Sequence, residues 1–279
     1  MGEYTFGFRK EWYHFFRTFR FWGVLIALTS VAIVNPLMIK AMAELTATML
    51  DASSGMMAGA GIDMSALDMV YTSGIVFGAA LSDLCNTALL VILLVLMAPF
   101  GGEQKKRATL IPSCSGLDNK YYLVPKFVLY NAVIFAASFL CGLLAGVICN
   151  ALFPEPVGFG QILFGALLCS IYLTFVLTIY MSLGLCTSRP GIMTIVIYLG
   201  HTFINSILMA MGLERFNPFT LYNVFAFDLY DPEFSLKSEA ASIIVGIVLS
   251  VVICVVMYFL TLTVLRNKRI NNQEDKPEF

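Results

Sequence analysis

Charged side chains are scarce in this chain of 279 residues, because Asp, Glu, Lys and Arg together make up only 13% of it. Apolar residues make up 59%, and the mean hydropathy is +0.83. A soluble core of this size does not hide so much apolar surface. The composition therefore excludes an ordinary soluble enzyme and predicts an integral membrane protein.

The sequence also lacks the motifs of common catalytic sites. It has no GxxxxGK[ST], GxGxxG or HExxH motif, and its seven cysteines show neither CxxC metal spacing nor a disulfide framework. An intramembrane serine protease would need Ser182 and His201 at one depth, but their helical positions differ by about 10 Å. We therefore expect no catalytic residue, metal or cofactor in this chain, and keep a membrane hydrolase as a distant alternative.

Long apolar runs are what the sequence has in abundance. A membrane-spanning helix needs about 20 apolar residues. Six stretches meet this length, roughly 21–43, 72–98, 126–152, 160–185, 191–212 and 240–265. The fold class we expect is all-α, a polytopic membrane protein with a transmembrane domain over 21–265 and a tail over 266–279. An even number of spans places both termini on one side of the membrane.

The basic residues indicate which side this is. All but three of the 17 Lys and Arg lie in the N-terminal arm, in the 99–126 segment, at Arg189 or in the tail. The exceptions are Lys40, Arg215 and Lys237. The positive-inside rule therefore predicts a cell-membrane protein with both termini and the 99–126 segment in the cytoplasm. The formal net charge of -1 hides this asymmetry and gives no reason to expect a nucleic-acid partner.

The first 20 residues predict an amphipathic helix. At 100° per residue, one arc of this helix is aromatic and the rest is mainly polar or charged. The aromatic residues are Phe8, Trp12, Phe15, Phe16 and Phe19. We expect this helix to lie along the cytoplasmic membrane surface and anchor the chain in lipid. The alternative is a plain aromatic belt with snorkelling cations.

A polar stripe marks the fifth span. Thr194, Tyr198, His201 and Asn205 share one helical face, and His201 lies roughly 15 Å from the cytoplasmic end, near the midplane. Two interpretations stay open. The stripe lines a translocation path, or it forms hydrogen bonds to a neighbouring helix.

Other residues interrupt the apolar pattern in the first three spans. Asp83 is either a cation ligand or a carboxylate that reaches water at the outer end of its span. Pro36 is expected to kink or end the first span. The 44–70 segment is either an external loop or one that dips into lipid. The Gly74-xxx-Gly78 and Gly142-xxx-Gly146 pairs predict close helix packing.

The 101–127 segment is a polar island between two apolar runs. It predicts a short amphipathic helix from Glu103 to Leu110, a turn around Pro112 to Gly116, and re-entry into the bilayer from Tyr121 to Lys126. Taken alone, the segment is an ordinary positive-inside loop. Taken with its surroundings, it has the properties of a helix that a cytoplasmic partner binds.

With these features, the whole chain resembles the permease subunits of type-2 ABC exporters. That family has an amphipathic helix before the first span, six spans, and a Glu-initiated coupling helix between spans two and three. The resemblance implies a coupling helix bearing Glu103, Gln104, Lys105, Arg107 and Thr109, although Ala108 stands where the family commonly has Gly.

The resemblance also implies partners and a pathway. ABC ATPase subunits would bind ATP and Mg, and a second permease subunit, identical or a sister chain, would complete the transporter. Family precedent and the polar stripe indicate a substrate pathway near Thr29, Asn86, Tyr198, His201 and Asn205, and the aromatic-rich interior indicates an amphipathic or apolar substrate. Two other classes stay open, an ATPase-independent secondary transporter or channel, and a noncatalytic membrane assembly or immunity protein.

Overall fold

The computed structural model describes residues 2–57, 71–97, 99–100, 119–187, 189–211, 218–230 and 236–274. Every regular element in these ranges is helical, and six stretches are long and apolar enough to cross a membrane. These stretches are Phe19–Met49, Ser73–Met97, Leu123–Leu152, Phe159–Cys186, Gly191–Leu208 and Glu239–Asn267. The predicted all-α fold with six spans is confirmed, and the chain is a multi-pass membrane protein.

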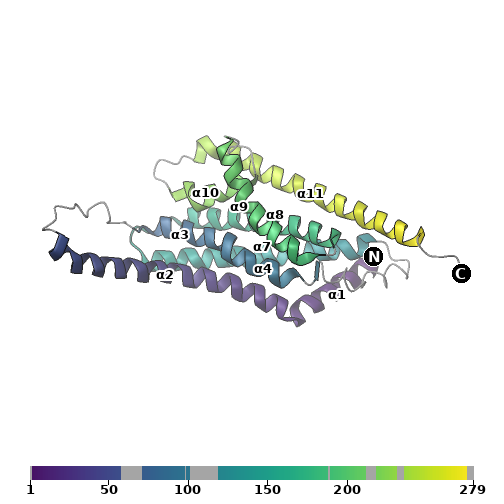
Figure 1. The fold of residues 1–279 in the computed structure, drawn as a ribbon, viewed down its shortest axis with the longest axis horizontal. Helices are drawn as coiled ribbons and strands as arrows, with labels where there is room; N and C mark the ends of the chain where they lie inside the picture. Colours follow the sequence, from purple (N-terminus) through teal and green to yellow (C-terminus); the bar gives the residue numbers. More distant parts are fainter. Residues whose placement is uncertain are drawn as a thin grey trace.

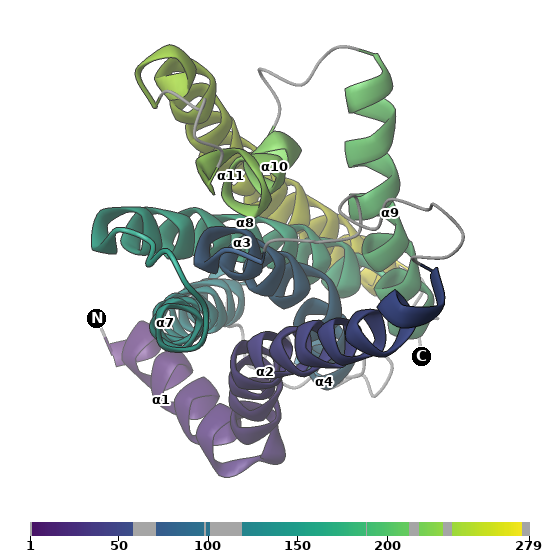
Figure 2. The same cartoon turned by 90° about the vertical axis from the view of Figure 1, so that its left-hand side faces the viewer.

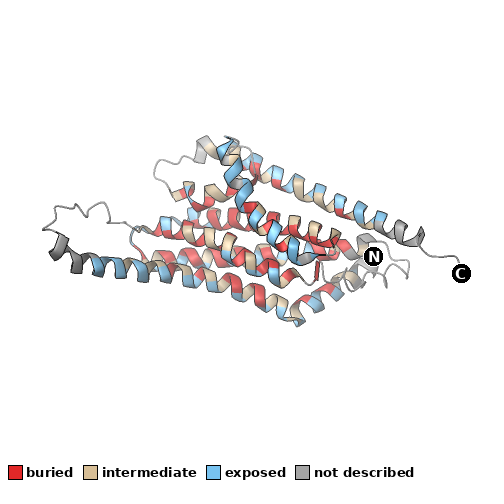
Figure 3. Cartoon of the chain, viewed as in Figure 1, coloured by how far each residue is buried: buried red, intermediate tan, exposed pale blue. Residues whose placement is uncertain are grey.

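The helix α8 (Phe159–Cys186) is the centre of the bundle. It packs along α7 (Asn119–Leu152) on one side and against α11 (Leu236–Glu274) on the other, as Figure 2 shows. The central helix α8 is mostly buried, whereas α11 and α2 (Phe19–Met57) present long exposed apolar faces (Figure 3). The beginning of α1 (Gly2–Arg17) and the end of α11 lie at one end of the molecule, as six spans require (Figure 1).

Two glycine pairs allow the close packing that their spacing predicts. A Cβ added at Gly146 would lie 2.5 Å from Cγ2 of Ile162, so α7 and α8 approach each other through this glycine. A Cβ at Gly78 would collide with the carbonyl oxygen of Ala226. Gly74 and Gly78 both lie against Tyr230 as well, so this second pair packs on the short helix α10 (Leu221–Ala226) and the turn after it, which no span prediction included.

The first span is longer than predicted. α2 continues through Pro36 as one helix to Met57, so of the two effects predicted for Pro36, a kink or a helix end, the helix end does not occur. Residues 44–57 are therefore helical rather than part of an external loop, and residues 58–70 lie outside the described ranges. A helix tolerates proline here because only one backbone hydrogen bond is lost within a long apolar segment.

The N-terminal helix divides the predicted aromatic arc between two environments. α1 ends at Arg17 and meets α2 at an angle (Figure 1). Trp12 and Phe19 are 51% and 76% exposed, as an anchor requires. Phe15 is fully buried instead, with its ring centroid 4.8 Å from that of Tyr130 on α7. The lipid-facing assignment of Phe15 is therefore wrong, because α1 packs on α7 along this row; Phe8 and Phe16 are intermediate.

The chain after the fifth span folds back onto the bundle. α9 (Pro190–Ala210) is followed by η6 (Pro218–Thr220), α10 and η7 (Asp228–Tyr230). Among these, α10 packs on α8 and on α3 (Ser73–Asp83). This arrangement brings polar side chains of α10 to the second span, where the site described next lies.

Candidate functional site

The second span is interrupted by a π-helical turn. α3 runs into η3 (Leu84–Ala88), which continues as α4 (Leu89–Met97). A π turn inserts an extra residue and disturbs the i to i−4 hydrogen-bond ladder, and such turns occur frequently at functional sites. The side chain of Asn86 compensates here, since its Nδ2 donates to the carbonyl oxygen of Ser82 at 3.1 Å. The turn thereby fixes the direction of the Asn86 amide.

Asn86 joins three parts of the bundle. Its Nδ2 also donates to the Tyr222 hydroxyl on α10 at 2.9 Å, and its Oδ1 lies 3.3 Å from Nε2 of His201 on α9. The Tyr222 hydroxyl is in turn hydrogen-bonded to the Ser82 hydroxyl. We call Ser82, Asn86, His201 and Tyr222 the π-turn cluster. Of these, the sequence predicted Asn86 and His201; Ser82 and Tyr222 were missed.

Both ring nitrogens of His201 lie next to oxygen atoms. Nδ1 of the imidazole lies 2.5 Å from the carbonyl oxygen of Tyr198, while Nε2 faces Oδ1 of Asn86. Because the Asn86 amide nitrogen is directed to Ser82, both ring nitrogens face oxygen acceptors. A neutral imidazole donates to one of them, and the imidazolium donates to both.

The predicted stripe on α9 faces protein in part. Thr194 is buried and its hydroxyl is hydrogen-bonded to that of Tyr180 on α8 at 3.0 Å. Tyr198 is half-buried, with its ring centroid 5.7 Å from that of His201. The side chain of Asn205 lies outside the described part of the chain. Interhelical hydrogen bonding is thus present at two of the four positions.

Two further predicted residues do not join the π-turn cluster. Thr29 on α2 donates its hydroxyl to Leu25 of its own helix at 2.7 Å. Asp83 accepts a hydrogen bond from Nδ2 of Asn35, which ties α3 to α2. Within the described ranges, no group of three His, Cys, Asp or Glu side chains is arranged to hold a metal ion. Asp83 therefore acts as an interhelical acceptor in this structure.

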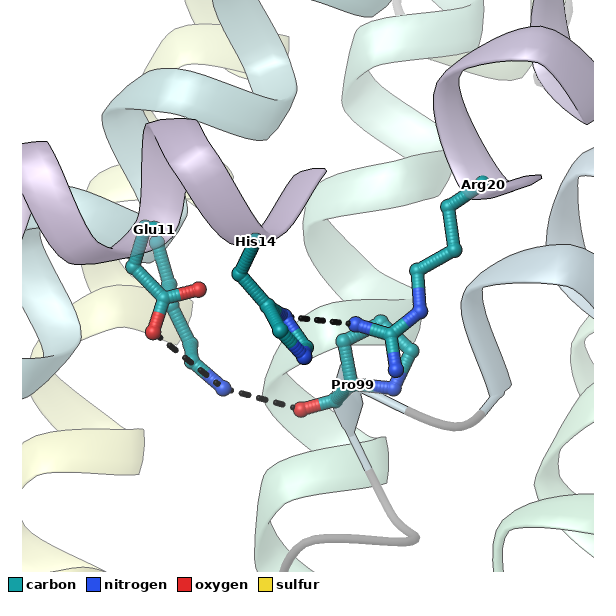
Figure 4. Close-up of polar contacts among 5 residues, drawn as sticks. Glu11, His14, Arg20 and Pro99 are labelled. Atoms are coloured by element: carbon teal, nitrogen blue, oxygen red, sulfur yellow. Dashed lines mark hydrogen bonds and ion pairs between the residues drawn. The ribbon is translucent and has the colours of Figure 1, made fainter. Parts of the chain in front are cut away.

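A second polar group lies where α1 meets α7 (Figure 4). Lys126 on α7 is fully buried, donates to the carbonyl oxygen of Pro99 at 3.0 Å, and has its Nζ 3.9 Å from Oε1 of buried Glu11 on α1. We call Glu11, Pro99 and Lys126 the α1–α7 link. The sequence placed Lys126 at the bilayer boundary but gave no signal for its pairing with Glu11.

The corner between α1 and α2 lies beside this link. A guanidinium nitrogen of Arg20 lies 2.9 Å from Nδ1 of His14, so the last turn of α1 is tied to the first turn of α2 (Figure 4). Pro99 and Lys126 flank the polar 101–118 segment in the sequence. The predicted coupling helix, with Glu103, Gln104, Lys105, Arg107 and Thr109, lies outside the described residues.

Together, the six spans and their buried polar contacts define a multi-pass α-helical membrane protein. Comparisons of the chain with family models, curated proteins and solved structures gave no match.

Proposed function

We propose that the chain is the membrane-spanning permease subunit of an ATP-driven ABC exporter. In this proposal both termini and the 101–118 segment are cytoplasmic, and the chain lies in the cell membrane. Separate ABC ATPase subunits bind ATP and Mg, and a second permease subunit, identical or a sister chain, completes the transporter. The substrate is amphipathic or apolar, such as a peptide, a lipid or a drug-like molecule.

The observation that carries this proposal is the α1–α7 link. Lys126 contacts both the carbonyl oxygen of Pro99 and the carboxylate of Glu11, and all of these contacts are buried. The two ends of the polar segment are thereby joined to each other and to the interfacial helix. A force applied by a partner to residues 101–118 would act on α1, α4 and α7 together.

The second span offers a route from this link into the bilayer. From Pro99 the chain leads back through α4 to the π turn, where Asn86 contacts α9 and α10. Long helices transmit a displacement at one end to groups bound at the other, and interrupted helices in membranes lie preferentially at functional sites. This arrangement supports a role for the π-turn cluster in switching the pathway between its inward and outward states.

Substitution of the coupling residues tests the proposal. We expect Glu103→Gln and Arg107→Gln to uncouple ATP hydrolysis from transport in vesicles that contain the purified transporter, because each removes a charge that contacts the ATPase. Membrane insertion and thermal unfolding should stay unchanged. Lys237→Gln removes a charge outside the coupling helix and serves as the matched control. Wild-type transport in both coupling variants would count against the assignment.

A second candidate function is an ATPase-independent, proton-linked transporter. The observation that favours it is the pair of acceptors facing the two nitrogens of His201 near the middle of α9. In that case the purified chain alone would accumulate substrate in vesicles when a proton gradient is applied, and His201→Gln would abolish the accumulation. An ABC permease without its ATPase would show no such uptake.

A further inference from the structure

The helix α1 carries an exposed charged row that the proposed function leaves unused. Arg9, Tyr13 and Arg17 follow i, i+4, i+8 spacing and form one row along the helix. All three are exposed, Tyr13 by 58%, and the guanidinium carbon of Arg9 lies 5.7 Å from the centroid of the Tyr13 ring. The row therefore presents two guanidinium groups and one phenol ring side by side.

The neighbouring row of the same helix is aromatic. Phe8, Trp12 and Phe16 share i, i+4, i+8 spacing, and the ring centroids of Trp12 and Phe16 lie 4.3 Å apart. The row on the far side of α1, which includes Glu11 and Phe15, is buried against the bundle. On the exposed surface of α1, the row of aromatic rings thus lies next to the row of guanidinium groups. This arrangement is typical of a helix at the boundary between the hydrocarbon and the head groups.

The charge of this surface is not balanced by the helix itself. α1 has two acidic residues, Glu3 in its first turn and Glu11, and the Glu11 carboxylate is turned inward to Lys126. No ion pair joins Arg9 or Arg17 to another described residue. The α1–α7 link therefore turns the Glu11 carboxylate away from this row, and the exposed row of Arg9, Tyr13 and Arg17 carries two positive charges.

We propose that this face of α1 binds the head groups of anionic phospholipids in the leaflet on which the helix lies. The planar guanidinium of arginine matches phosphate oxygens in a two-point geometry, and tryptophan and tyrosine are enriched at head-group level. Each cation near an anionic surface contributes about fivefold to the affinity. This binding does not require an ATPase partner, so it stands independently of the proposed transport function.

The two tryptophans of the chain allow a direct test. Trp12 and Trp22 are the only ones, so the Trp22→Phe variant leaves Trp12 as the single tryptophan emitter. The full-length variant is placed in phosphatidylcholine vesicles with either brominated phosphatidylglycerol or brominated phosphatidylcholine at equal mole fraction. We expect the brominated anionic lipid to quench Trp12 more strongly, on the order of twofold to fivefold. High salt should reduce the difference, because it screens exposed charges.

Matched substitutions separate head-group binding from simple insertion. Adding Arg9→Gln and Arg17→Gln to the Trp22→Phe variant should make the two brominated lipids quench Trp12 equally. Both lipids should still quench it, because the aromatic row keeps α1 in contact with the membrane. Adding Lys40→Gln and Lys237→Gln removes the same charge elsewhere and should preserve the preference. Equal quenching before any arginine is replaced, or no quenching by either lipid, overturns the proposal. If the arginine variant does not fold, the Trp22→Phe protein still tests the proposal, because its preference for the brominated anionic lipid should fall as the salt concentration rises.

Discussion

At the scale of single residues, two intramembrane polar side chains, Lys126 and Asn86, each meet polar groups from other segments of the chain. Lys126 has no exposed surface, yet its ammonium contacts a carbonyl oxygen and a carboxylate. Asn86 likewise meets groups from α9 and α10. In a medium without water, such pairing decides whether a polar residue is tolerated.

The first prediction concerns the buried ion pair. Lys126→Met removes the cation that faces the Glu11 carboxylate, so we expect it to lower the free energy of unfolding by about 3 kcal/mol. The measurement is denaturant unfolding in mixed micelles. The double variant Glu11→Gln/Lys126→Met should recover most of the loss, because no buried charge is then left. Additive losses in the double variant would show that the two side chains are not coupled.

The second prediction compares two residues that the sequence placed on one pathway. Asn86→Leu removes the donor to the Ser82 carbonyl and the Tyr222 hydroxyl and the oxygen that faces Nε2 of His201, which costs about 1–3 kcal/mol. Thr29→Val removes a hydroxyl that bonds to its own helix, so the loss should stay below about 0.5 kcal/mol. Both values come from the same unfolding assay. Equal effects at the two positions would contradict the assignment of Asn86 to the π-turn cluster.

At the scale of elements, the helices differ from those predicted from the sequence where contacts with another element change their shape or their packing partner. The stretch Leu84–Ala88 contains neither proline nor glycine, so its π turn has no local signal. The glycine spacing in the second span predicted close packing correctly, but the partners are α10 and Tyr230 rather than a span. Pro36 is the opposite case, because a local signal for a helix end is overridden within a long apolar helix.

The third prediction tests the contact between the second span and α10. Gly78→Ala adds a methyl group that meets the carbonyl oxygen of Ala226, so α10 must move. We expect a loss of about 1–3 kcal/mol in the free energy of unfolding. Gly200→Ala is the matched control, since nothing lies within 4 Å of its added Cβ. Alanine there should be neutral or stabilise α9 by up to about 1 kcal/mol. A neutral Gly78→Ala would contradict the packing of α10.

At the scale of the whole molecule, the number and approximate positions of the spans could be predicted from length and hydropathy alone. Lipid imposes this regularity, because a spanning segment must be apolar and satisfy its own backbone. The two polar sites could be predicted only in part. Asn86, His201 and Lys126 stood out as polar residues in apolar surroundings, whereas Ser82, Tyr222 and Glu11 acquire their roles through contacts with distant segments.

The central claim is that a separate ATPase acts on the 101–118 segment. A photo-crosslinking residue introduced at position 105 of the tagged chain tests it most directly, in native membranes and with identification of the adduct by mass spectrometry. The account predicts an adduct with a protein that contains a Walker motif, and none when the same group replaces exposed Leu45 at the other end of the first span. An ATPase adduct at position 45 and not at 105, or labelling of position 105 by an impermeant reagent from outside the cell, would contradict the account.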